Sequence, residues 1–199
     1  AGNDTLRGGS GANTIYGGDG NDTIYVDSTT DTLYGDAGND LFVLGDSTSG
    51  QTFTKDSFTK ISGGTGQDTL ELRGSNNVLN LTGLVGDKLT SLEIIDISGS
   101  GGNSIILDAS ALTANTSREG GAPLVIWGNA GDAYELTGAG WVINTGAGVP
   151  GYTVYTNGGQ TLHVQDDMVR VQTTNGGTLT NERDRKSTRL NSSHMPKSR

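Results

Sequence analysis

The stretch GGDGNDTIY, residues 17–25, decides the fold of this chain. Six residues rich in Gly, Asn and Asp are followed by three residues with a large apolar side chain, Ile24, at their centre. Glycine tolerates positive φ and Asn and Asp favour turns, whereas β-branched residues favour strands. The stretch therefore predicts a tight turn followed by a short β-strand.

The same nine-residue unit recurs on both sides of residues 17–25. Neighbouring copies are GGSGANTIY at 8–16, VDSTTDTLY at 26–34 and GDAGNDLFV at 35–43. Two sets of positions follow the period: the apolar residues Leu6, Ile15, Ile24, Leu33 and Phe42, and the polar residues Asp4, Asn13, Asp22, Asp31 and Asp40. A fixed short period is typical of a solenoid, in which each repeat packs on its neighbours.

Beyond residue 44 the period breaks and then returns out of phase. Residues 45–62 are rich in Ser and Thr, and we expect a loop or an irregular coil there. The unit GGTGQDTLE at 63–71 then places Asp68 and Leu70 at the repeat positions. From Val78 onward, short alternating apolar runs are separated by Gly, Asn and Asp turns, and no segment carries a helical period.

These patterns divide the chain into five parts. We predict a nonapeptide repeat region at 1–46, an irregular insert at 47–62, an isolated repeat with a transition at 63–87, a β-rich C-terminal region at 88–182 and a disordered tail at 183–199. Within that tail, DRKSTRLNSSH resembles one reading frame of a common sequencing-adapter oligonucleotide. We expect the chain to be a fragment, because Ala1 falls in the middle of a repeat.

The amino-acid composition argues against several classes of function and of metal site. Asp and Glu number 22 against 13 Lys and Arg, so the formal charge is −9, which disfavours nucleic acid and attracts cations. No cysteine is present, which excludes disulfides and thiolate metal sites. No apolar run is long enough for a membrane span. Only 32% of residues are hydrophobic, so a bound metal is one way to complete the stability of a thin core.

Residues 17–25 match the pattern G-G-x-G-x-D-x-U-x, and over 1–43 and 63–71 the chain resembles the repeats-in-toxin (RTX) family. The resemblance implies an all-β fold: a parallel β-roll, in which two nonapeptides make one coil, followed by an irregular β-rich or β-solenoid region. Residues 18 apart would then stack on one edge of the roll, and residues nine apart would lie on opposite edges. Asp4, Asp22 and Asp40 would share one edge.

The resemblance also implies Ca²⁺ between stacked turns, a cation that takes six to eight hard oxygen ligands. The implied ligands are carboxylates and turn carbonyls, namely Asp4, Gly18, Gly20, Asp22, Asp36, Gly38 and Asp40, with Asp31 and Asp68 as further candidates. On the second edge, Val26, Asp27 and Thr29 replace the motif glycines, so we expect lopsided calcium loading. The alternative is that the repeats are turns of a metal-free solenoid.

Without an ion, stacked carboxylates repel one another, and the short strands bury little apolar surface. We therefore expect the apo repeat to be largely unfolded. As the resemblance implies, such a chain would pass a type I secretion machinery unfolded and fold outside the cell, where calcium is plentiful. The expected partners are calcium ions and that machinery, and the expected state is a monomer.

Enzyme signals are weak. GAGVPG at 146–151 matches G-x-G-x-x-G but leads into a strand pattern, and His163 alternates with apolar residues. Asp166 and Asp167 would point to opposite faces of a strand, so they cannot act as a catalytic pair. We expect no catalytic activity in this chain.

Residues 88–172 resemble the C-terminal region of very large type I-secreted surface proteins and adhesins. Two function classes remain open: a calcium-gated structural module of an adhesin, or the secretion and folding domain of an exported hydrolase or toxin. A third hypothesis is a carbohydrate-binding module built on aromatic residues, which are Tyr134, Trp141, Tyr152 and Tyr155.

Overall fold

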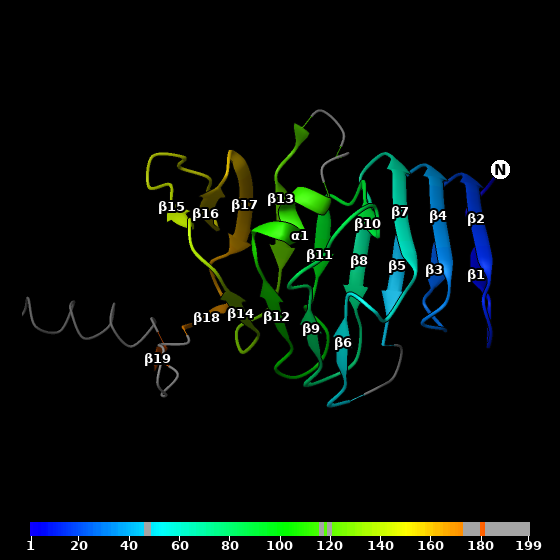
Figure 1. The fold of residues 1–199 in the computed structure, drawn as a ribbon, viewed down its shortest axis with the longest axis horizontal. Coiled ribbons are helices and arrows are strands. Elements are labelled where there is room, and N and C mark those ends of the chain that lie inside the picture. Colours follow the sequence, from blue (N-terminus) through cyan, green and yellow to red (C-terminus); the bar gives the residue numbers. More distant parts are fainter. Residues whose placement is uncertain (46–48, 116–117, 119–120, 173–179, 182–199) are drawn as a thin grey trace, which may run out of the picture.

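The computed structural model describes residues 1–45, 49–115, 118, 121–172 and 180–181. Three β-sheets, most of whose strands are parallel, wind around one continuous hydrophobic core (Figure 1). The predicted all-β class with a parallel β-roll is confirmed. The tail predicted at 183–199, with its adapter-like segment, lies outside the described residues.

The strands fall into a long, a short and a third sheet. The long sheet contains, in order, β1 (Thr5–Arg7), β3 (Thr23–Tyr25), β5 (Leu41–Leu44), β8 (Thr69–Leu72), β11 (Ile94–Asp96), β13 (Leu124–Trp127), β17 (Gln160–Gln165), β16 (Tyr152–Asn157) and β15 (Val142–Ile143). The short sheet contains β10 (Leu89–Thr90), β7 (Lys60–Thr65), β4 (Thr32–Ala37) and β2 (Thr14–Asp19). The third sheet contains β19 (Thr180–Asn181), β18 (Val169–Gln172), β14 (Ala133–Leu136), β12 (Ser104–Leu107), β9 (Val78–Asn80) and β6 (Thr52–Thr54).

The first coils have the register that the repeat predicts. In the long sheet Leu6 pairs with Ile24, and Ile24 pairs with Phe42, so each coil holds 18 residues. In the short sheet Ile15 pairs with Leu33. The central apolar residue of each unit points into the space between the two sheets, where Ile24, Leu33 and Phe42 are fully buried.

Residues 47–62, expected to form an irregular insert, contribute β6 and the start of β7. Phe58 is fully buried, and Phe53 packs against the core. The stretch thus lengthens one coil: Phe42 pairs with Leu70 and Leu33 pairs with Ile61, each 28 residues apart. The Ser/Thr-rich composition hid this strand, because its apolar residues do not follow the nine-residue period.

The insert also starts the third sheet, where β6 pairs with β9 in parallel. In Figure 1 the two-sided roll lies toward the end marked N, and the third sheet follows it along the long axis. At the far end, β16 and β15 extend the long sheet by antiparallel pairing. The C-terminal region therefore continues the solenoid with a different cross-section.

One short helix, α1 (Ala109–Ala114), interrupts the β structure of the C-terminal region, where the sequence predicted none. Asp108 caps it, because its side chain accepts a hydrogen bond from the Ser110 amide at 3.0 Å. Ala111 and Leu112 are buried. Six residues are too few to show a helical period in the sequence. Among the described residues, no helix is sufficiently long and apolar to cross a membrane.

Candidate metal centre

Three glycine-rich turns stack on one side of the roll. Residues 17–22, 35–40 and 63–68 each lead from the short sheet to the long sheet, and Gly2 and Asp4 lie in register with them. We call this surface the aspartate edge and define it by Asp4, Asp22, Asp40 and Asp68. The third turn belongs to the repeat that looked isolated in the sequence, and the 28-residue coil brings it into register.

The four aspartates of this edge form a ladder. The Asp4 amide donates to Asp22 Oδ1 at 2.7 Å, and the Asp22 amide donates to Asp40 Oδ1 at 2.8 Å. The Asp40 amide donates in turn to Asp68 Oδ1, also at 2.8 Å. One oxygen of each acceptor carboxylate is therefore used to join two coils.

The second carboxylate oxygen, Oδ2, does not take part in these amide hydrogen bonds. Asp22 and Asp40 are each only 1% exposed, and the Oδ2 atom of each is buried without a hydrogen-bond partner among the described residues. A buried anionic oxygen of this kind carries a large desolvation cost unless a cation or donor compensates it. The ladder is thus incomplete with protein atoms alone.

Backbone carbonyls converge on the same space. A Cβ added to Gly17 would clash with Asp22 Oδ2 and would lie 2.7 Å from the Gly35 carbonyl oxygen. The corresponding Cβ on Gly35 would clash with Asp40 Oδ2 and lie 2.5 Å from the Gly63 carbonyl oxygen. Each pair of coils therefore places an aspartate oxygen and a glycine carbonyl near one point that no side chain occupies.

The remaining sequence-predicted carbonyl ligands lie in these turns as well. Gly18, Gly20 and Gly38 have positive φ, and Gly38 (φ 133°) packs directly on the Gly20 carbonyl, where a Cβ would collide. Asp36 occupies a motif-glycine position and still adopts φ 74°. All nine predicted metal ligands except Asp31 are thus on the aspartate edge.

The pKa of Asp40 is shifted in the direction expected for a buried carboxylate beside other negative charges. Burial raises the pKa of Asp40 above its ordinary value, and the negative charges of Asp22 and Asp36 raise it further, against the opposing hydrogen bond from the Asp22 amide. Burial and the two neighbouring negative charges therefore oppose ionisation of this carboxylate.

Asp31 lies on the opposite edge and is satisfied by protein donors. Its Oδ1 accepts from the amide and the side-chain nitrogen of Asn13, both at 3.1 Å, and its Oδ2 accepts from the Ser28 amide at 3.0 Å. Asp27, which replaces a motif glycine, forms an ion pair with Arg7 at 3.1 Å. The structure therefore does not bring Asp31 together with the other predicted ligands.

A second ladder, which the sequence analysis missed, runs through the C-terminal region. The Gln51 amide donates to Asn77 Oδ1, the Asn77 amide to Asn103 Oδ1 and the Asn103 amide to Asp132 Oδ1, each at 2.8 Å. We call Asn77, Asn103 and Asp132 the amide ladder. Their spacings of 26 and 29 residues follow no fixed period, so the nine-residue repeat did not reveal that they stack.

The second atom of each amide-ladder residue has a partner. Asn77 Nδ2 donates to the Arg73 carbonyl at 2.9 Å, and Asn103 Nδ2 donates to the Ile97 carbonyl at 3.1 Å. Asp132 Oδ2 accepts from the Asn129 amide at 2.6 Å. This ladder is complete without an ion.

An exposed asparagine ladder also flanks the aspartate edge. Asn3 Oδ1 accepts from the Asn21 amide, and Asn21 Oδ1 accepts from the Asn39 amide, each at 2.8 Å. These residues are 18 apart at the fifth position of the repeat, so the period could have revealed them. They hold adjacent turns in register beside the carboxylates.

The donor set fits a hard divalent cation. No three His, Cys, Asp or Glu side chains among the described residues are grouped to hold a metal ion. An ion on the aspartate edge would therefore combine one or two carboxylates with backbone carbonyls, which is the oxygen chemistry that calcium prefers. Asp22 Oδ2 and Asp40 Oδ2 are the oxygens left for it.

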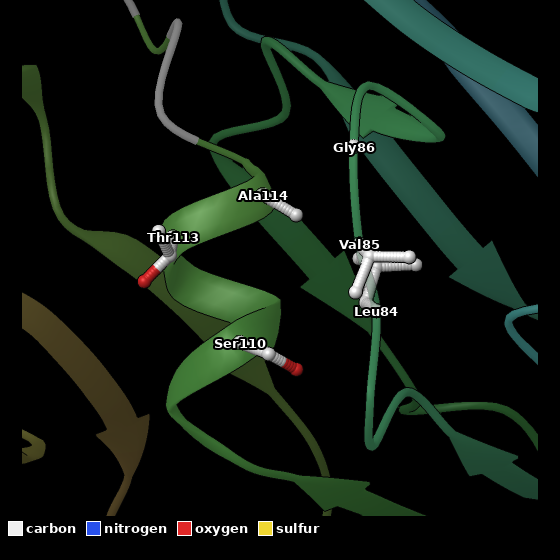
Figure 2. A pocket seen from close by; sticks show the side chains of 6 residues that line it. All are labelled: Leu84, Val85, Gly86, Ser110, Thr113 and Ala114. Carbon is white, nitrogen blue, oxygen red and sulfur yellow. The ribbon is translucent and has the colours of Figure 1, made fainter.

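A hollow beside α1 and two sequence motifs lie away from the aspartate edge. Figure 2 shows a hollow of about 460 Å³ between α1 and Leu84–Gly86, and its described lining is Leu84, Val85, Gly86, Ser110, Thr113 and Ala114, with no carboxylate. GAGVPG at 146–151 lies in the connection from β15 to β16, so no helix follows it. Burial lowers the pKa of His163, which lies beside Tyr152.

The aromatic residues considered as a carbohydrate platform are largely packed inward. Tyr134 and Tyr155 are buried, and their hydroxyl groups are 2.8 Å apart. Trp141 contacts Tyr155 edge-on and donates to the Thr137 carbonyl at 2.9 Å. Tyr152 accepts a hydrogen bond from Trp127 at 3.0 Å. Three of these four residues therefore support the core rather than a sugar-binding surface.

Comparison with protein families gives one match. Residues 1–33, 28–47 and 59–83 match the RTX calcium-binding nonapeptide repeat (4 copies). These repeats bind calcium and form a structural rather than a catalytic module, so the predicted calcium-binding RTX-type repeat is confirmed for this part of the chain. Comparisons with curated proteins and with solved structures gave no significant match.

Proposed function

We propose that this chain is a calcium-binding structural module of a secreted or surface bacterial protein, which folds when it binds calcium outside the cell. The observation that carries the proposal is the pair of buried oxygens, Asp22 Oδ2 and Asp40 Oδ2, which lie close to glycine carbonyls and find no hydrogen-bond partner in the described part of the chain. A calcium ion would supply the positive charge that both oxygens lack.

The proposed ligands follow the aspartate edge. Carboxylates would come from Asp4, Asp22, Asp40 and Asp68, and carbonyls from turn residues that include Gly18, Gly20, Asp36 and Gly38. The carbonyl oxygens of Gly35 and Gly63, which the structure adds to this set, border the same points. Asp31 is left out, because amide hydrogens already satisfy its carboxylate.

Sites of this kind in extracellular modules have dissociation constants on the order of 10⁻⁴ to 10⁻³ M. At cytosolic calcium they would stay empty, and the repelling carboxylates would hold the roll unfolded; outside the cell they would fill. Binding free energy would then become folding free energy. RTX repeat proteins are typically exported by type I systems, which supports an extracellular or cell-surface location for a chain that must remain unfolded during export.

The role proposed for the described region is structural, and no catalytic site is assigned to it. The family match supports a non-catalytic repeat module. The ladder geometry supports a scaffold whose ions join successive coils. Whether the parent protein is an adhesin or an exported hydrolase does not alter this role.

The test is a titration followed by far-UV circular dichroism, with calcium raised from zero to about 10 mM and magnesium as the control ion. Calcium alone should produce a cooperative gain of β signal. Asp40→Ala should raise the calcium midpoint by roughly tenfold, because it removes a charged ligand. Asp19→Ala, an exposed carboxylate of the same edge, is the matched control and should leave the midpoint nearly unchanged. A chain that is fully folded in chelator and indifferent to calcium would refute the proposal.

A further inference from the structure

The aspartate edge ends at a turn of different construction. Six residues, 63–68, lie between Ser62 and Thr69, whereas only three, 91–93, lie between Thr90 and Ile94, which pair with those two residues in the next coil. Glu93 takes the ladder position there, because the Asp68 amide donates to its Oε2 at 2.8 Å. This short turn contains no glycine, and the Ser91 carbonyl packs against Gly63. The carboxylate ladder therefore continues for one step without the carbonyl-rich turn of the repeats.

A buried arginine is tied to this turn. Arg118 is only 6% exposed, as is Glu93. Its guanidinium donates to the Asn115 carbonyl, to the Ala122 carbonyl at 2.7 Å and to Gln160 Oε1 at 3.2 Å. Five donors in a planar fork allow one guanidinium to hold several acceptors while it keeps its charge.

Asn115 joins the arginine to the short turn. Its Oδ1 accepts from the Leu92 amide at 3.0 Å, and its Nδ2 donates to the Leu92 carbonyl at 2.7 Å. Leu92 is the residue directly before Glu93. The amide side chain thus occupies the backbone groups of the turn on the side where a further repeat would stack.

Through Asn115 and Leu92, the buried Arg118 guanidinium is placed close enough to Glu93 for the two charges to attract each other. Burial lowers the pKa of Arg118, and the Glu93 carboxylate opposes this by raising it. Opposite charges that are both away from water are screened little, so each charge offsets part of the desolvation cost of the other.

We propose that the Arg118 guanidinium is the fixed cation that closes the carboxylate ladder at Glu93, where the repeats above it would take a metal ion. Calcium would then be confined to the coils from Asp4 to Asp68, and the last carboxylate would be neutralised at any calcium concentration. The part that concerns calcium rests on the proposed function. The pairing of Glu93 with Arg118 does not.

A fixed cation suits this place in the chain. The glycine-rich turns of the aspartate edge all precede this turn in the chain, whereas Asn103 and Asp132 of the amide ladder follow it. Arginine keeps its charge at any physiological pH, and it needs no ion to be present. It gives the roll a permanent neutral boundary on which each newly bound coil can stack.

The test is a double-mutant cycle with Arg118→Met, Glu93→Gln and both together. Thermal unfolding is followed by tryptophan fluorescence, because the two tryptophans, Trp127 and Trp141, both lie beyond the turn. Each single substitution leaves one uncompensated buried charge and should lower the melting temperature by roughly 10 °C at saturating calcium. The double variant should regain at least half of that loss, and Arg118→Lys should lose less than Arg118→Met.

The matched control is the half-buried pair Arg73 and Glu71, whose guanidinium and carboxylate atoms are 2.6 Å apart. Arg73→Met and Glu71→Gln should each have a small effect, with little coupling between them. If the Arg118 double variant loses as much as the sum of its singles, the proposal is overturned, and Arg118 is only a hydrogen-bond anchor. If either single fails to fold, the same question is decided by whether the double variant folds.

Calcium binding is measured on the same proteins by equilibrium dialysis. The charge-balanced double variant should bind as much calcium as the wild type, since the coils from Asp4 to Asp68 are unchanged. Absence of calcium binding by the wild type would refute the proposed function while the coupling of Glu93 with Arg118 could still be positive. Normal calcium binding with no coupling would refute only the role of Arg118.

Discussion

The aspartate edge and the amide ladder both join successive coils through side-chain oxygens, but they differ in the other terminal atom of the side chain. In both, a side-chain oxygen accepts the backbone amide of the preceding coil, at 2.8 Å for Asp40 and at 2.8 Å for Asn103. The second atom of Asn103 is an N–H donor that bonds the Ile97 carbonyl, whereas the second atom of Asp40 is an oxygen to which no described residue donates a hydrogen bond. The asparagine side chain carries its own N–H donor for the nearby carbonyl, whereas the aspartate carboxylate requires a separate cation to balance its charge.

This difference divides the solenoid into two kinds of coil. Coils joined by the amide ladder are complete when the chain has folded, and they also enclose most of the large buried side chains beyond residue 72. Coils joined by the aspartate edge bury anions that carry a free-energy cost until a cation arrives. Calcium dependence is therefore expected to belong to residues 1–72 and not to the whole chain.

The largest expected effect comes from giving the aspartate edge the amide side chains of the amide ladder. In Asp22→Asn/Asp40→Asn, each side chain keeps its Oδ1 acceptor and gains an N–H donor toward the turn carbonyls, as Asn13 shows on the opposite edge by donating to the Gly11 carbonyl at 3.3 Å. We expect this variant to fold in chelator and to lose its response to calcium. Circular dichroism with and without calcium measures both. A variant that is unfolded in chelator would show that the carboxylate charge is not what holds the apo roll open.

The reverse change should damage the C-terminal region at any calcium concentration. Asn103→Asp removes the hydrogen bonds to the Ile97 and Gly74 carbonyls and buries a negative charge, so we expect a loss of about 2–4 kcal/mol in the free energy of unfolding. Urea unfolding monitored by tryptophan fluorescence gives the value. Asn144→Asp, at an exposed turn, is the matched control and should change stability very little. Equal losses in the two variants would contradict the role given to the ladder.

The smallest expected effect concerns Asp36, a non-glycine residue with φ 74° at a motif-glycine position. Asp36→Gly relieves this strain and removes a charge that raises the Asp40 pKa, at the cost of a more flexible unfolded chain. We expect a net gain of about 0.5–1 kcal/mol in the stability of the calcium-bound roll. Asp36→Asn, which removes the charge and keeps the side chain, separates the two contributions. A loss of stability in Asp36→Gly would show that the Asp36 carboxylate itself contributes to the site.

The sequence predicted most reliably what repeats at a fixed distance. The buried row of Ile24, Leu33 and Phe42 follows from the nine-residue period. The 18-residue register and the stacking of Asp4, Asp22 and Asp40 follow from the period together with the two-repeat coil that the RTX resemblance implies. Asp68 was recognised as a repeat position, but the 28-residue coil that carries it to the same edge could not be foreseen. Its extra residues pack through Phe53 and Phe58, which follow no period.

The missed features depend on contacts between distant segments. Asn77, Asn103 and Asp132 are aligned only by the three-dimensional path of coils of unequal length. The placement of Arg118 near Glu93 depends on the chain that returns after α1, and neither residue belongs to a motif. Local composition predicts turns and strands, whereas the neighbour that stacks on each turn is set by coil length.

The central claim is that calcium dependence is confined to the aspartate edge, and hydrogen–deuterium exchange of the whole chain tests it most directly. In chelator, amides of residues 1–72 should exchange rapidly while those of β9, β12 and β14 remain protected, and calcium should protect the first group only. Equal protection of both groups in chelator, or equal loss of protection in both, would contradict the account.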